Sequence, residues 1–148
     1  MRRNKDVYMN YVCPYCFNTV NKCTCKLYPP YHLILIDKGI QEHIRMLNNK
    51  GYKTIGCCEG HYKGNCISTY IAFPMDYGFG ESIEVPDGFK YHKKRRMIYF
   101  DYSQRLSEEE MEELKKEKLN NLLEWCNNLK ERDSLLEWCN NLKERELD

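Results

Sequence analysis

The 148-residue sequence lacks any apolar run that approaches the length of a membrane span. Its first residues, which include Arg2, Arg3 and Lys5, are not followed by the apolar stretch that a signal peptide requires. Both absences argue against insertion into or passage through a membrane. We therefore expect a cytoplasmic protein with no membrane partner.

Common catalytic and nucleotide-binding motifs are also missing. The sequence contains neither a Gly-x-x-x-x-Gly-Lys loop nor a Gly-x-Gly-x-x-Gly loop, so we predict no conventional phosphate cradle. No Ser-His-Asp set and no paired-carboxylate motif is complete. These absences favour a binding protein over an enzyme.

Cysteine, in contrast, is abundant, with nine residues in the chain. In a reducing compartment such a set points to metal binding or catalysis before disulfides. Four of the cysteines form two close pairs, Cys13-x2-Cys16 and Cys23-x-Cys25, whose thiolates can surround one Zn2+ tetrahedrally. The residues between the pairs are too few for a hydrophobic core, so metal would supply the folding energy. We predict a zinc knuckle and a linker in residues 1–30.

A second group of reactive side chains lies between two predicted strands, residues 51–56 and 68–73. Cys58 and His61 have a spacing that lets both turn toward one ion, and Gly60 gives the backbone the freedom to turn. The loop is interpreted as a metal site, a catalytic site, or a buried thiol pair beside a surface histidine. The candidate metal ligands are Cys57, Cys58, His61 and Cys66. The candidate catalytic residues are Cys58, Glu59 and His61.

Charge is unevenly distributed along the chain. Residues 107–148 carry thirteen acidic and seven basic side chains, whereas the preceding part is basic. A basic body with an acidic tail can meet a polyanion on one side. Residues 89–102 predict a hairpin with a basic tip, whose cations contact phosphates and whose tyrosines stack on bases. The alternative is a solvated turn flanked by core aromatics. The predicted nucleic-acid-binding residues are Lys90, Tyr91, Lys93, Lys94, Arg95 and Arg96.

The remaining periodicity predicts an α+β body in residues 31–106. A short strand ends at Asp37, which we expect to cap a helix with Ile40, Ile44 and Leu47 on one stripe. His43 lies off that stripe and is predicted to be a surface residue. The fold class is therefore α+β, with a small mixed or antiparallel sheet and two packing helices, preceded by the zinc knuckle.

The second helix belongs to a C-terminal helical segment, residues 107–148. Ser107 and Glu110 form a capping box at its start. Residues 122–132 recur as residues 135–145, a tandem repeat with a period of 13 residues. In one continuous helix this shift rotates the pattern by about 220° beyond three full turns, so both copies cannot face the same core. The helix therefore breaks near Asp133, or the second copy projects and favours a homodimer through its apolar face.

Residues 37–73 resemble the core of the methyltransferase family of tRNA wybutosine synthesis. That family shows a helix ending in Leu-Asn, a strand ending in Thr, and then Ser-Ser-Cys-Ser-Gly-Arg. Here Leu47-Asn48, Thr54 and Cys57-Cys58-Glu59-Gly60-His61 occur in the same order, with Cys57 in place of Ser and His61 in place of Arg. The stretch is also similar to small proteins of low-GC bacteria and their phages that carry a Ser/Cys-Cys-x-Gly-His loop. The first resemblance implies RNA modification, and the second brings no function with it.

Two hypotheses follow for function. The first is a zinc-stabilised protein that binds nucleic acid or a nucleoprotein, such as a phage or mobile-element regulator or an anti-CRISPR-like counter-defence factor. The second is a small RNA- or nucleotide-modifying enzyme that uses the loop of Cys58 and His61. We favour the first because no conventional catalytic set is complete.

Overall fold

The computed structural model describes residues 9–14, 16–19, 21–23, 25, 33–64 and 66–132. In chain order the elements are β1 (Met9–Val12), β2 (Ile34–Asp37), the 3-10 turn η2 (Lys38–Ile40), α2 (Gln41–Asn49), β3 (Gly56–Cys58), β4 (Ser68–Ala72), β5 (Lys90–His92), β6 (Met97–Asp101) and α3 (Glu108–Asn128). β1 and β2 form one antiparallel sheet, and the order β3-β4-β6-β5 forms a second. The α+β class is confirmed, with the antiparallel arrangement of the two that were predicted.

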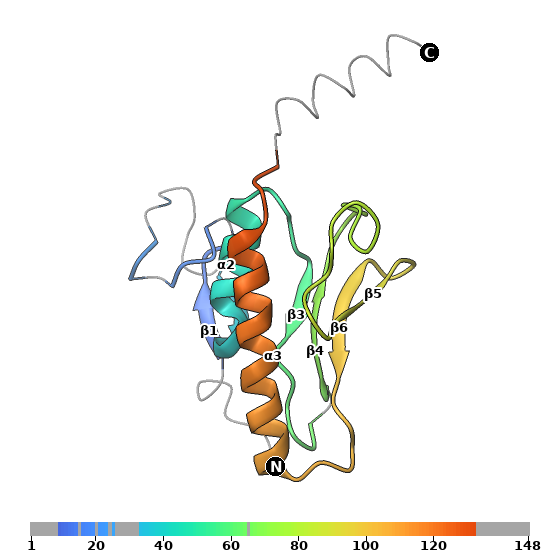
Figure 1. The fold of residues 1–148 in the computed structure, drawn as a ribbon. Coiled ribbons are helices and arrows are strands. Elements are labelled where there is room, and N and C mark those ends of the chain that lie inside the picture. Colours follow the sequence, from blue (N-terminus) through green and yellow to red (C-terminus); the bar gives the residue numbers. More distant parts are fainter. Residues whose placement is uncertain are drawn as a thin grey trace.

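The core lies where the two helices meet the larger sheet. α2 and α3 lie side by side, and α3 runs along the four-stranded sheet (Figure 1). The predicted apolar stripe is confirmed, because Ile40, at the end of η2, and Ile44 and Leu47, in α2, are all buried. They pack with buried residues of the sheet and of α3 in one cluster. Its central members are Ile40, Ile44, Leu47, Ile71, Phe73, Ile98 and Leu122.

α3 begins as the sequence predicts. The Oγ atom of Ser107 accepts a hydrogen bond from the Glu110 N–H at 3.1 Å, and the Glu110 carboxylate accepts one from the Ser107 N–H at 3.0 Å. The helix then buries Met111, Leu122 and Cys126 against the core. Because the capping box fixes the first turn, the inner face is set from the start of the helix.

His43 is not on the surface, contrary to the prediction. It is 4% exposed, and its Nε2 atom lies 2.7 Å from the Leu119 carbonyl oxygen of α3. The face of α2 beside the apolar stripe is covered by α3, which a helical pattern read from α2 alone does not reveal. Burial lowers the pKa of His43, despite the hydrogen bond to Leu119 that works in the opposite direction.

The strand predicted at residues 51–56 is also displaced. β3 begins only at Gly56, so Cys57 and Cys58 lie on a strand and not in the loop that follows. The residues before β3 are held by α2 instead, since the Asn48 side chain bonds both the N–H and the hydroxyl of Thr54. This side-chain contact at the end of the helix replaces the strand pairing that alternation predicts.

The segment predicted as a separate knuckle is joined to the body. β1 pairs with β2 over the whole length of both strands, and Val12 and Phe17 are buried in the main core cluster. The Gln41 side chain, on α2, links the two parts by bonding Asn10 at 2.7 Å and the Phe17 carbonyl at 3.4 Å. The linker expected near residue 30 and the second repeat copy, residues 135–145, lie outside the described residues.

Candidate functional site

The two predicted cysteine pairs come together at the end of β1. The thiol sulfurs of the four residues all lie within 4.8 Å of one another. Cys13 and Cys16 lie on a tight turn that the Phe17 N–H closes on the Cys13 carbonyl at 2.9 Å, and Cys23 ends a second turn, where its N–H bonds the Thr19 carbonyl at 2.9 Å. The members of the set are Cys13, Cys16, Cys23 and Cys25. This geometry confirms that the predicted knuckle is a plausible metal site.

Hydrogen bonds among the thiols of this cluster shift the pKa values of Cys16 and Cys25. Burial would raise the pKa of Cys16, but hydrogen bonds from the Asn18 backbone and from the other thiols outweigh it and lower the pKa to about 7. The hydrogen bond with Cys16 in turn raises the pKa of Cys25 to about 12, with burial adding to the effect. The pKa values of Cys16 and Cys25 thus shift in opposite directions, as expected where one ionised sulfur accepts hydrogen bonds from its neighbours.

A second cluster joins the end of β2 to the end of β3. Ligand atoms of Asp37, Cys58 and His61 lie within 4.8 Å of one another. The His61 Nε2 atom is 3.0 Å from the Asp37 carboxylate, which also accepts the Glu59 N–H at 2.9 Å. Asp37 makes no side-chain bond to cap the following helix, so that prediction is wrong. The carboxylate is used instead across the fold, by residues more than twenty positions away.

Burial and the contacts within this second cluster shift the pKa values of Asp37 and Cys58. Burial would raise the pKa of Asp37, but the hydrogen bonds with His61 and with the Glu59 N–H outweigh it and lower the pKa. Burial raises the pKa of Cys58, and the neighbouring Cys66 thiol adds to the increase. A nucleophilic cysteine needs the opposite shift, toward the thiolate. The raised pKa therefore does not favour a nucleophilic role for Cys58.

The other predicted members of this site differ in position. The Cys66 thiol donates to the Ser68 carbonyl at 3.3 Å and is not part of the group of ligand atoms within 4.8 Å of one another. Cys57 packs against the hydrophobic core, and burial raises its pKa to about 12. Successive residues of a strand point to opposite faces, so Cys57 and Cys58 cannot both face one ion. Asp37, and not the predicted Cys57, lies beside Cys58 and His61 as a candidate metal ligand.

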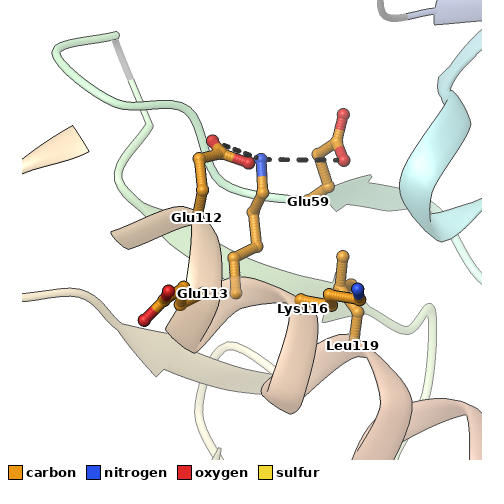
Figure 2. Close-up of a pocket in the computed structure, with 6 residues that line it drawn as sticks. Glu59, Glu112, Glu113, Lys116 and Leu119 are labelled. Atoms are coloured by element: carbon orange, nitrogen blue, oxygen red, sulfur yellow. Dashed lines mark ion pairs between the residues drawn. The ribbon is translucent and has the colours of Figure 1, made fainter. Parts of the chain in front are cut away.

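Glu59, a predicted catalytic candidate, faces away from the cysteines toward α3. Its carboxylate lies 3.9 Å from the Lys115 ammonium group, which also pairs with Glu112 at 3.1 Å. Figure 2 shows Glu59 and Glu112 joined through this ammonium group at a cavity of about 440 Å³. Burial raises the pKa of Glu59, and Lys115 partly offsets the increase. The Glu59 carboxylate also packs against Gly39, where an added Cβ would clash with it.

A second cavity, of about 290 Å³, lies beyond the histidine. Residues that follow His61 line one side of it, and residues after β6 and in α3 line the other. The lining residues are Tyr62, Lys63, Gly64, Ile67, Tyr102, Ser103, Gln104 and Met111. No local sequence pattern predicts this cavity, because its walls come from segments about forty residues apart.

The basic hairpin has the predicted form. β5 and β6 are joined by a four-residue turn, residues 93–96, in which every side chain is exposed. β5 is the outer strand of the sheet, so the tip stands at the edge away from β1 (Figure 1). Lys93 pairs with Glu81 at 2.8 Å. Within the described part of the chain, Lys94, Arg95 and Arg96 take part in no ion pair.

Tyr91 does not offer the stacking surface that was predicted. Its ring packs on the buried Phe79 with centroids 5.8 Å apart, and its hydroxyl donates to Asp76 at 3.3 Å. The residue is half-buried, in contrast to Lys90 beside it, which is exposed. The Tyr91 ring is therefore partly occupied by packing within the protein, whereas the cations of the turn are exposed.

The helices give no sign of a membrane anchor: in the described residues none is both long and apolar enough to cross a bilayer. The resemblances drawn from residues 37–73 remain predictions. Comparison with protein-family models, with curated proteins and with solved structures finds no match for this chain.

Proposed function

We propose that this protein is a zinc-stabilised nucleic-acid-binding protein. The predicted knuckle would hold one structural Zn2+ through Cys13, Cys16, Cys23 and Cys25. The tip of the β5–β6 hairpin would contact phosphates. The observation that carries the metal assignment is the close approach of four thiol sulfurs, all within 4.8 Å. The exposed cations of residues 93–96 support the second part.

Zinc is favoured over other metals by the donor set. Four thiolates around Zn2+ at about 2.3 Å from the metal would lie about 3.8 Å apart, so the cluster needs only a small contraction to close on the ion. Hard cations such as Mg2+ and Ca2+ prefer oxygen donors, which this cluster does not supply. Because Val12 and Phe17 are buried in the main core cluster, a metal here would also hold the turn that begins at Cys13 against the core.

The hairpin supports binding to the phosphate backbone without base recognition. All four cations of the turn are exposed, three of them outside any ion pair of the described residues, whereas the predicted stacking residue Tyr91 is half-buried against Phe79. Contacts of this kind release counterions, so affinity should fall steeply with salt and depend little on sequence. A regulator or counter-defence factor of phage or mobile-element origin would be compatible with such binding, and that role stays a prediction.

The proposal is tested by paired charge reversals in the full chain. Lys94→Glu with Arg95→Glu removes two tip cations, whereas Lys53→Glu with Lys116→Glu makes the same change of net charge at exposed sites elsewhere. Binding to a fluorescent duplex DNA and to a single-stranded RNA is measured from low to high salt. The tip variant should lose affinity and lower the salt slope by about 2, at roughly one unit per phosphate contact.

The matched variant decides the interpretation. If both double reversals weaken binding equally, net charge and not the hairpin is responsible. If wild-type protein binds neither probe at low salt, the nucleic-acid proposal is wrong and a protein partner becomes the favoured target. The zinc assignment is judged separately by elemental analysis, where Cys13→Ser with Cys16→Ser should lose one equivalent of Zn2+ per chain.

The enzyme hypothesis receives less support from the geometry. Asp37, His61 and Cys58 resemble the order of groups in a Cys-His-Asp nucleophilic set, in which an acid orients a base that activates a thiol. Burial disfavours the thiolate of Cys58, and neither cavity described above is lined by Cys58 or His61. A substrate would have to reach a thiol that is 7% exposed.

A further inference from the structure

We propose that Asp37, Cys58 and His61, completed by Cys66, form a second metal site that binds Zn2+ and closes the loop after β3. This site is separate from the knuckle and shares none of its ligands. It also differs from the set that the sequence suggested, since a carboxylate takes the place of Cys57.

The spacing of the donors fits one ion. The three principal ligand atoms lie within 4.8 Å of one another, and His61 Nε2 is 3.0 Å from Asp37 Oδ2. Nitrogen and oxygen ligands of a tetrahedral Zn2+, each at about 2.0–2.1 Å, would be about 3.3 Å apart. The pair therefore needs to separate by only a few tenths of an ångström to admit the metal between them.

Cys66 supplies the fourth donor. Its sulfur is not among the ligand atoms that lie within 4.8 Å of one another and donates to the Ser68 carbonyl, so it has to turn inward to bind. The backbone keeps Cys66 beside the site, because the His61 N–H bonds the Cys66 carbonyl at 2.8 Å. Gly60 makes the reversal of the chain possible with a φ of +94°, a conformation that other residues rarely adopt. The resulting set of two sulfurs, one nitrogen and one oxygen suits a borderline cation such as Zn2+.

The surroundings point to a structural ion and not to an open catalytic one. Asp37 and Cys58 are buried, and His61 is largely covered. Four protein ligands would fill a tetrahedral shell, which leaves no position for water or substrate. The Glu59 N–H on the Asp37 carboxylate at 2.9 Å orients that ligand from outside, as is usual around metal sites.

The position of the site gives the ion a specific task. It would tie the end of β2 to the end of β3 and anchor the segment that begins at His61. Tyr62, Lys63 and Ile67 of that segment line the cavity of about 290 Å³. Loss of this metal should therefore loosen one wall of the cavity while leaving the knuckle intact.

Elemental analysis of the full-length protein tests the proposal. Protein produced with Zn2+ and dialysed against metal-free buffer should hold two equivalents per chain. Cys58→Ser and Asp37→Asn should each retain one, and so should Cys13→Ser with Cys16→Ser. The matched control is Cys57→Ala, which alters the adjacent thiol on the opposite face of β3 and should retain two.

Cobalt titration of the wild-type chain keeps the test valid if these variants fold poorly. The knuckle would contribute four thiolates and the second site two, so the second equivalent of Co2+ should add about half as much thiolate-to-metal absorption as the first. Saturation at one equivalent would overturn the second site and leave the knuckle assignment standing. Loss of the second metal in Cys57→Ala but not in Cys58→Ser would also overturn it.

Discussion

Lys50 closes the C-terminal end of α3 from outside that helix, and its removal should weaken the fold measurably. The residue follows α2, and its ammonium group donates to the carbonyl oxygens of Cys126, Asn127 and Leu129 at 2.8, 2.7 and 2.7 Å. The last carbonyls of a helix have no partner within it, and the helix dipole makes that end negative. One cation thus satisfies three acceptors and joins the ends of the two helices.

The magnitude follows from these contacts. A hydrogen bond to a charged group contributes about 1.5–3 kcal/mol, and a cation at a partly buried helix end up to about 2 kcal/mol. These figures describe the same contacts and are not added, and ordering the lysine side chain costs up to about 2 kcal/mol. We expect Lys50→Met, which keeps most of the aliphatic stem, to lower the free energy of unfolding by about 2 kcal/mol.

Urea unfolding followed by circular dichroism is a suitable assay. With a urea dependence of about 2 kcal/mol per molar, the expected loss moves the midpoint by about 1 M and leaves the slope unchanged. The matched control is Lys53→Met, which removes an exposed cation three residues away and should change stability by less than about 0.5 kcal/mol. Equal shifts for the two variants would refute the capping role of Lys50.

Three further outcomes are expected. Because burial lowers the pKa of His43, the unfolded chain binds more protons below pH 6.5, and stability should fall on acidification by at most about 1.4 kcal/mol per pH unit. His43→Gln should show a smaller fall between pH 7.5 and pH 5 in urea unfolding, and an equal fall would exclude His43 as the cause. Gly60→Ala should lower the melting temperature, because φ is +94° and the added Cβ would lie 2.9 Å from the Tyr102 ring, whereas Gly56→Ala, with open space around it, is the control. Truncation after Arg132 should leave the melting temperature nearly unchanged and reduce any dimer seen by size-exclusion chromatography, and an unfolded product would mean that the second repeat copy is part of the core.

The features that the sequence predicted correctly depend on neighbours along the chain. The stripe of α2 and the capping box of α3 are patterns over three or four residues, and the hairpin of β5 and β6 joins adjacent strands. The cysteine pairs of the knuckle are equally local, since the members of each pair are two or three positions apart in the sequence. In all these cases the interacting groups are close in sequence, so spacing alone carries the information.

The features that were missed depend on partners far away in the sequence. His43 contacts the Leu119 carbonyl, 76 residues later in the chain. The Asp37 side chain contacts His61, 24 residues later, and does not cap the helix that follows it. Nothing in the local pattern around either residue indicates these contacts. Asp37 after a buried strand is consistent with an N-cap and with a metal ligand, and only the pairing of distant segments distinguishes the two.

The C-terminal end of α3 also depends on residues far away in the sequence, although the sequence at that end occurs twice in the chain. Residues 122–132 and 135–145 have one sequence, and so one intrinsic preference for helix. In the first copy the helix ends at Asn128, and Arg132 then donates its N–H to the Lys50 carbonyl at 2.8 Å. The contacts that close this end of the helix come from Lys50, which lies 76 to 79 residues earlier in the chain. Tertiary contacts therefore set the residue at which α3 ends, and the sequence of residues 122–132 does not specify it alone.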